Sequence, residues 1–326
     1  MTTQAPYASL SPELVLDALE AVDLRCDGRV LALNSYENRV YQIGVEDGTP
    51  VVVKFYRPQR WTDEAILEEH GFAAELAAQD IPVIAPLALG GRTLHRHAGF
   101  RFAVFARRGG HWPELGTAVD REWLGRTLGR IHGVGRAGRF WHRPRLSIEE
   151  LGHRSRDLVL GGGWLPDYLA PKYERVTGDL LEEIERRAAD WGGAQCGRIL
   201  GDCHRGNILW ADDGPHLVDL DDCLTGPAVQ DLWMLLAGGP GEMRRDLTDL
   251  LRGYEQFLPF DRGELGLIEP LRALRMIHYS AWLARRWADP AFPRAFPWFV
   301  EPRYWEEHYR ALEEQLEAVR APPIEL

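Results

Sequence analysis

The chain contains 326 residues, of which 45% are hydrophobic and 27% are charged, as is usual for a folded globular protein. Because domains usually contain about 100–200 residues, this length predicts two domains or lobes. The formal net charge of −11 argues against a dedicated nucleic-acid binder, since contacts to phosphates require clustered lysine and arginine.

The sequence carries no signal for export or for membrane insertion. Its first ten residues, MTTQAPYASL, lack a basic region followed by an apolar one, and no apolar run reaches about 18 residues. The four cysteines form no CxxC pair and are too few for a disulfide framework in so long a chain. We therefore expect a cytoplasmic monomer with reduced cysteines and with neither a membrane nor a nucleic-acid partner.

The first third of the chain has a β pattern interrupted by one helix. Ser11 and Thr62 are expected N-caps, and each precedes an amphipathic segment. Short runs of β-branched and aromatic residues, separated by turn residues, predict strands. The expected strands are 30–33, 40–45, 51–56, 92–97 and 100–105, and the second helix is 63–79.

The remainder of the chain is mainly helical and begins after Gly109-Gly110. One β-hairpin interrupts it, with a turn at Asp213-Gly214-Pro215. Helical periodicity predicts helices over 123–131, 179–191 and 267–287, and the first of these is expected to end at His132-Gly133. The expected hairpin strands are 208–210 and 216–220. The predicted fold class is α+β, with a small β-rich N-lobe (residues 1–107) and a larger helical C-lobe (residues 108–326).

The strongest chemical signal is the segment GDCHRGN, followed by the segment HLVDLD. Phosphoryl transfer needs a carboxylate that orients the attacking hydroxyl and oxygen ligands that hold Mg²⁺ against the phosphates. Asp202 fits the first role, and Asn207 and Asp219 fit the second, because the hairpin brings the two together. An acidic surface turn explains one such residue easily, but explains the whole arrangement poorly.

Lys54 ends an apolar strand, where burial of its ammonium group requires a partner. Glu68 and Glu69 of the next helix both compete for this role. At about 100° per residue, Glu69 shares a face with Ile66 and Leu76, whereas Glu68 lies on the polar side. We therefore expect a Lys54–Glu69 pair that holds nucleotide phosphates.

The turn LNSYENRVY between the first two strands contains no glycine and thus no GxGxxG motif. The Ser35 hydroxyl or backbone N–H groups could still bind a phosphate. An ordinary polar hairpin explains the turn equally well, and both interpretations stay open.

Other polar residues carry weaker signals. Asp231 is either an acid at a helix N-terminus or the group that holds the catalytic loop. We favour a surface position for Asp221 and Asp222. The arginines and aromatic residues of the predicted helix 267–287 could line a substrate groove, but core packing with solvated arginines is slightly favoured. These residues are Arg272, Arg275, Arg285, Arg286, Tyr279, Trp282 and Trp287.

The segments GDCHRGNILW and VDLDD resemble the aminoglycoside phosphotransferase and choline kinase-like superfamily, which shares the protein-kinase fold. LNSYENRVYQ, VVVKFYRPQRW, GPAVQDLWMLL and RRWADPAFP further resemble the bacterial stress response kinases, a family of serine/threonine protein kinases. These blocks span about residues 33–298 and follow the same order.

The resemblance implies a two-lobed protein-kinase-like fold and an ATP- and Mg²⁺-dependent enzyme. Its expected partners are ATP and proteins with serine or threonine acceptors, and autophosphorylation and a role in stress response are also implied. Adenine would bind backbone groups near 105–107. The implied site residues are Asp202 as proton acceptor, Asn207 and Asp219 as Mg²⁺ ligands, and Ser35, Lys54 and Glu69 as ATP-binding residues.

Two departures from the superfamily pattern stand out. Leu200 occupies a position that is often histidine, so the order of the catalytic loop must come from packing of Leu200. Asp219 is followed by Leu-Asp instead of Phe-Gly, and only a short segment separates it from Asp231. We therefore expect no activation-loop phosphorylation.

Two alternatives remain. A small-molecule kinase acting on an amino-alcohol or aminoglycoside-like hydroxyl would share the fold and chemistry, but would need an acidic, enclosed groove. A non-catalytic nucleotide-binding scaffold would require the loss of a motif residue, and all of these residues are present.

Overall fold

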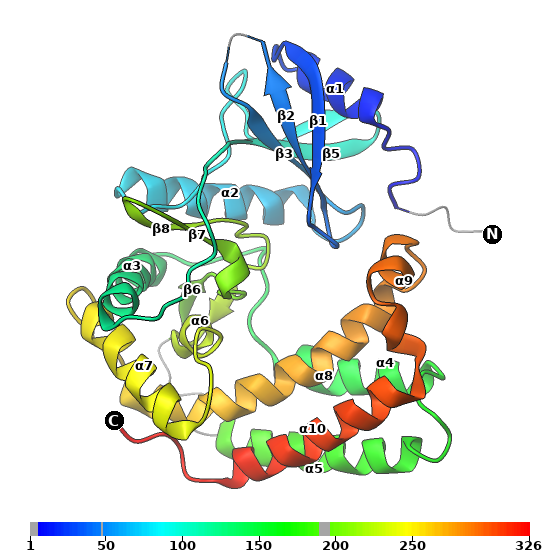
Figure 1. Ribbon diagram of the computed structural model, residues 1–326, viewed down its shortest axis with the longest axis vertical. Coiled ribbons are helices and arrows are strands. Elements are labelled where there is room, and N and C mark those ends of the chain that lie inside the picture. The colour runs from blue at the N-terminus through cyan, green and yellow to red at the C-terminus, as the bar shows by residue number, and fades with distance from the viewer. Residues whose placement is uncertain (1–5, 47, 189–195) are drawn as a thin grey trace.

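The computed structural model describes residues 6–46, 48–188 and 196–326. An antiparallel five-stranded sheet forms the N-lobe, with strand order β1-β2-β3-β5-β4 (Figure 1). Its strands are β1 (Cys26–Leu33), β2 (Arg39–Val45), β3 (Val51–Phe55), β4 (His95–His97) and β5 (Phe100–Ala106). We propose that the lobes divide after residue 107, just beyond the end of β5.

Two helices cover the two faces of this sheet. Helix α1 (Pro12–Glu20) buries Val15 and Leu19 against one face, together with Val53 of β3. Helix α2 (Asp63–Ala78) lies on the other face, where Ile66 packs beside Ala103. Because side chains alternate along a strand, Lys54 points to the α2 face while its neighbour Val53 points to the α1 face.

Both helices begin as the sequence predicts. The Ser11 hydroxyl accepts a hydrogen bond from the Leu14 backbone N–H, and the Thr62 hydroxyl accepts one from the Ala65 N–H. These bonds satisfy N–H groups that the first turn of a helix leaves without a partner.

The C-lobe is mainly helical and carries two small antiparallel sheets. Strand β6 (Gly197–Ile199) pairs with β9 (Leu224–Gly226), and β7 (Ile208–Ala211) pairs with β8 (Gly214–Leu217). Figure 1 shows α5, α8 and α10 running alongside one another at the base of the lobe. The helices are α3 (Ala118–Arg136), α4 (Arg154–Gly161), α5 (Ala170–Ala188), α6 (Val229–Trp233), α7 (Pro240–Tyr254), α8 (Ile268–Arg286), α9 (Ala291–Ala295) and α10 (Pro302–Arg320).

Helix α2 belongs to the cores of both lobes. Ile66 packs under the sheet, whereas Phe72 and Leu76 join the largest apolar cluster of the C-lobe, which also contains Leu128 and Leu217. The position of α2, and hence of Glu69, is therefore determined by packing against the C-lobe as well as against the sheet.

The order and type of the predicted elements agree with the structure, with differences at their ends. Helix α3 passes through His132-Gly133, where the sequence predicted its end, because His132 and Gly135 are buried on the face that packs against the C-lobe. Strand β8 ends at Leu217 instead of continuing to 220, since Asp219 adopts a left-handed φ of 56°. The pair β6–β9 was not predicted.

The strand expected over 92–97 contains only His95–His97. The helix expected over 179–191 begins earlier, at Ala170, and residues 189–191 of that prediction lie outside the described residues. All four cysteines are free. No helix in the described ranges is both long and apolar enough to cross a membrane.

His70 of α2 couples stability to pH. It is 3% exposed, and its ring nitrogens lie 2.7 Å from the Tyr56 hydroxyl and 2.8 Å from the Thr93 hydroxyl. Burial, helped by the charge of Lys54, lowers the pKa of His70 to about 3.

Because this pKa is lower in the folded state, the unfolded chain binds the additional proton at acidic pH. The contribution of His70 to the free energy of unfolding is fully present above about pH 6.5. It falls by about 1.4 kcal/mol per pH unit below that value. In urea unfolding of His70→Asn, the free energy of unfolding should depend less steeply on pH at acidic pH. The difference in slope should correspond to the uptake of one proton fewer on unfolding. The two proteins should differ by a constant amount above pH 7.5, and equal slopes at acidic pH would contradict the assignment.

Candidate functional site

The loop that follows β6 carries Asp202 and Asn207. The Asn207 amide donates a hydrogen bond of 3.0 Å to the Asp202 carbonyl, which fixes the orientation of the amide. Its Oδ1 accepts no hydrogen bond from any described residue, so this oxygen remains available to a cation.

Gly201 and Asp231 hold this loop in place. Gly201 has a φ of 81°, and a Cβ there would lie 2.3 Å from the Asp222 carbonyl oxygen, so only glycine fits. The buried Asp231 carboxylate accepts hydrogen bonds from the backbone N–H groups of Leu200, at 2.7 Å, and Gly201, at 2.8 Å. Of its two sequence interpretations, Asp231 thus takes the loop-holding role.

His132 completes this support from helix α3. Its Nε2 lies 3.0 Å from Asp231, and its Nδ1 lies 3.0 Å from the Tyr254 hydroxyl. The sequence predicted that packing of Leu200 would replace the missing histidine. Leu200 is indeed buried, but hydrogen bonds to Asp231 also order the loop, and a histidine from a distant segment orients that carboxylate.

Lys54 forms the predicted ion pair with Glu69, with 2.7 Å between Nζ and Oε1. Its ammonium group also lies 3.2 Å from Asp219 and 3.7 Å from Asp221. Burial alone would lower the pKa of Lys54, but these carboxylates raise it well above its ordinary value, so the group stays charged.

Glu68 faces away from Lys54, as the helix geometry predicted. Its carboxylate accepts hydrogen bonds from the backbone N–H groups of Trp141, His142 and Arg143. Glu68 therefore fixes a C-lobe segment against α2.

The prediction that Asp221 lies on the surface was wrong. Asp221 is 2% exposed and accepts hydrogen bonds from the Asn38 amide, at 3.0 Å, and from Arg60. Burial tends to raise the pKa of Asp221, but the charges of Arg60, Lys54 and Arg143 outweigh it and lower the pKa below its usual range. The surface prediction holds better for Asp222, whose half-exposed side chain pairs with Arg60.

The turn between β1 and β2 is tied to the C-lobe. The Ser35 hydroxyl donates to the Asn38 carbonyl at 3.2 Å, which tightens the turn. Glu37 accepts hydrogen bonds from Trp282, at 2.8 Å, and from Arg286, at 2.6 Å, both on α8. Side-chain contacts to α8 thus fix the turn against the C-lobe.

A second tie runs from the end of β3 to the segment between α8 and α9. Asp289 lies 2.7 Å from Arg57 and 3.3 Å from Arg39. Sequence reasoning assigned no role to Asp289, Asn38 or Arg60. All three lie in blocks that carried the family resemblance, which was the only available signal.

The Asp202 carboxylate contacts two side chains of the C-lobe. Arg275 of α8 donates to its Oδ1 at 2.6 Å, and His204 lies 3.4 Å from its Oδ2. Burial would raise the pKa of Asp202, but the hydrogen bond with His204 and the charge of Arg275 lower it below its usual range. The carboxylate is therefore ionised at neutral pH.

Arg275 also lines a groove beside this loop, together with His204, Trp233, Arg272 and Tyr279. The favoured prediction of core aromatics and solvated arginines was wrong for Tyr279, which is exposed, but right for Arg275, which is also exposed. It was right for Trp282, which packs in the core, and for Arg285, which is exposed.

The donor set fits Mg²⁺. The described residues contain no cluster of three or more His, Cys, Asp or Glu side chains that could hold a metal ion by themselves. Mg²⁺ usually binds one or two carboxylates and completes its shell with water and substrate phosphates. Asp219 and the free Oδ1 of Asn207 supply such a partial set.

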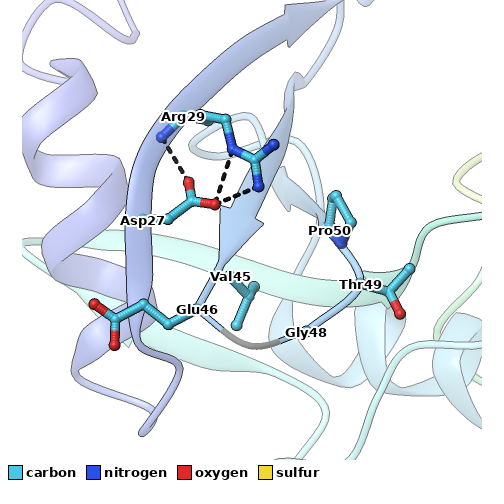
Figure 2. A pocket seen from close by; sticks show the side chains of 7 residues that line it. All are labelled: Asp27, Arg29, Val45, Glu46, Gly48, Thr49 and Pro50. Atoms are coloured by element: carbon cyan, nitrogen blue, oxygen red, sulfur yellow. Dashed lines mark hydrogen bonds and ion pairs between the residues drawn. The ribbon is translucent and has the colours of Figure 1, made fainter.

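A larger hollow of about 870 Å³ lies elsewhere, between β1 and the turn that joins β2 to β3. Figure 2 shows that Asp27 pairs there with its neighbour Arg29. None of the residues that the sequence predicted to bind ATP or Mg²⁺ lines this open hollow.

Comparisons with known proteins agree with this geometry. The profile of the phosphotransferase enzyme family (APH) matches residues 29–268. Stress response kinase A of Escherichia coli K12 is 46% identical over 321 residues, covering 98% of this chain and 97% of the relative. Serine/threonine protein kinase RdoA of Salmonella typhimurium is 44% identical with the same coverage.

Among solved structures, amicoumacin kinase hAmiN in complex with AMP-PNP, Ca²⁺ and Ami superposes with a TM-score of 0.68 at 18% identity, covering 92% of this chain and 93% of that one. A microcompartment-associated aminopropanol kinase also gives 0.68, at 19% identity, covering 94% and 98%. These similarities support the two-lobed kinase-like fold.

We predict that Asp231→Asn destabilises the protein by about 3–5 kcal/mol, because an amide cannot accept from both N–H groups and His132 in a buried site. Urea unfolding measures this change. Asp212→Asn, at an exposed aspartate of the neighbouring hairpin, should change stability by less than about 0.5 kcal/mol. Similar values for both variants would show that the Asp231 network does not hold the loop.

Proposed function

Because the chain belongs to the phosphotransferase enzyme family, we propose that it transfers the γ-phosphate of ATP to serine or threonine side chains of proteins. The observation that carries this proposal is the convergence of Lys54, Asp202, Asn207 and Asp219 in one region, with Lys54 held by carboxylates of both lobes. Phosphoryl transfer depends mainly on positioning and charge stabilisation, and this arrangement supplies both.

In the proposed reaction, the acceptor hydroxyl oxygen forms a new bond to the γ-phosphorus, and the bond between that phosphorus and the β-γ bridging oxygen breaks. ADP leaves with the bridging oxygen. The hydroxyl proton passes to the Asp202 carboxylate, which is ionised and able to accept it.

Asn207 and Asp219 would hold Mg²⁺, which when bound neutralises charge on the phosphates. Lys54 would contact the phosphates, and Glu69 would keep its ammonium in place. Ser35 lies in the turn that would cover the phosphates, and the backbone near 105–107 would bind adenine.

The character of the groove favours a protein over a cationic metabolite. An amino-alcohol or aminoglycoside substrate would need acidic groups, whereas the groove beside Asp202 contains Arg272 and Arg275 and no carboxylate among its described lining residues. The relatives at 44–46% identity are named as a stress response kinase and a serine/threonine protein kinase. The proposal therefore includes a cytoplasmic role in stress response and autophosphorylation.

Replacement of the proposed base tests the proposal. Asp202→Ala should lower the rate of phosphate transfer from labelled ATP by about 10²–10⁴-fold, since the acceptor hydroxyl loses its orienting group. Asp212→Ala is the control and should retain activity. Phosphorylated sites in a protein lysate are identified by mass spectrometry, with a panel of amino alcohols and aminoglycosides assayed in parallel. Unchanged transfer by Asp202→Ala, or transfer only to metabolites, would contradict the proposal.

The tie between Glu37 and α8 gives a second prediction. Glu37→Gln removes the charge that Arg286 contacts, so the turn above the nucleotide should become less ordered and the KM for ATP should rise by about tenfold. Steady-state kinetics at varied ATP concentration measure this change. Glu20→Gln, on the exposed side of α1, should leave the KM unchanged.

A further inference from the structure

The groove beside the loop that carries Asp202 has a volume of about 380 Å³ and is lined by two arginines, two histidines, two methionines and three aromatic side chains. Arg272 and Arg275 lie three residues apart on α8, and therefore on one face of the helix. Trp233 and Tyr279 also line the groove.

Neither arginine is fully engaged. The Arg272 guanidinium lies 5.4 Å from the Trp233 ring, its Nε lies 3.1 Å from Glu269, and its Nη2 donates to Met243 Sδ at 3.4 Å, whereas its Nη1 has no hydrogen-bond partner among the described residues. Arg275 is exposed and makes one hydrogen bond, to Oδ1 of Asp202. Each guanidinium group thus keeps N–H donors that no described residue accepts, and these could bind a further acceptor.

We propose that this groove binds an aspartate or glutamate side chain next to the acceptor serine or threonine, so that the enzyme selects acidic protein segments. The inference rests on the proposed function and adds its substrate class. Guanidinium groups bind carboxylates through paired, charge-assisted hydrogen bonds, and the aromatic rings pack against the peptide.

Arg275 links this selection to the reaction. In the structure it donates a hydrogen bond to Oδ1 of Asp202 and so competes with an incoming hydroxyl for this carboxylate. A substrate carboxylate offers Arg275 an alternative partner, and its binding releases Asp202 to accept a hydrogen bond from the acceptor hydroxyl. An acidic flanking residue should therefore increase kcat as well as lower KM.

The test uses three peptides that differ only in the residues flanking one serine, which are aspartate, asparagine or lysine. Binding is measured by fluorescence anisotropy without ATP, and phosphate transfer is measured with labelled ATP. We expect the aspartate peptide to bind about tenfold more tightly than the asparagine peptide, and to give a kcat/KM at least tenfold higher.

Charge reversal in the groove provides the decisive comparison. Arg272→Glu should shift the preference from the aspartate to the lysine peptide, and Arg275→Gln should lose the kcat advantage of the aspartate peptide. Arg285→Gln, at an exposed position of the same helix outside the groove lining, should keep the preference of the unaltered protein. Equal use of the three peptides, or a preference that Arg272→Glu does not change, overturns the inference.

The two measurements separate this inference from the proposed function. Phosphate transfer without an acidic preference overturns the inference alone. Acid-selective binding that Arg272→Glu reverses, without transfer to any peptide or protein, supports the groove as an acidic-peptide site and overturns the proposed protein kinase activity. Failure of both binding and transfer overturns both.

Discussion

The buried ammonium group of Lys54 needs negative partners, and these partners come from both lobes. Glu69 lies on α2, whereas Asp219 and Asp221 follow β8 in the C-lobe. A buried charge without a partner costs several kcal/mol, so separation of the lobes would expose or unpair this group. The same requirement positions α2, whose apolar residues already pack into the C-lobe core. The position of α2 relative to the C-lobe thus follows from one electrostatic constraint and one packing constraint.

The turn between β1 and β2 is not ordered in the way that a glycine-rich loop is. Glycine-rich loops place backbone N–H groups close to phosphates through their conformational freedom. In this chain, side chains fix the turn instead. Asn38 donates to Asp221, and Glu37 accepts from Trp282 and Arg286. The polar groups of the turn therefore connect the N-lobe sheet directly to α8, and order there depends on contacts between the lobes.

The net charge of −11 is unevenly distributed. Carboxylates surround Lys54 and Arg60 and neutralise these buried cations, and Asp219 is one of those that pair with Lys54. On the other side of the loop that carries Asp202, the charged side chains are positive, because Arg272 and Arg275 line the groove there. Asp202 lies between the two regions and is paired with Arg275. A protein with a negative net charge can thus carry a local cluster of positive side chains at a groove of its C-lobe.

The sequence by itself determined the lobe composition, the order of most elements and the Lys54–Glu69 pair, because these depend on local patterns. Strand and helix periodicity, caps at Ser11 and Thr62, and the 100° rotation that separates Glu69 from Glu68 are properties of neighbouring residues. Only the tertiary structure decided that Asp221 is buried, that His132 supports Asp231 and that Arg275 pairs with Asp202. Each of these contacts joins residues about 70 to 180 positions apart, and no local pattern encodes which distant partner will compensate a buried charge.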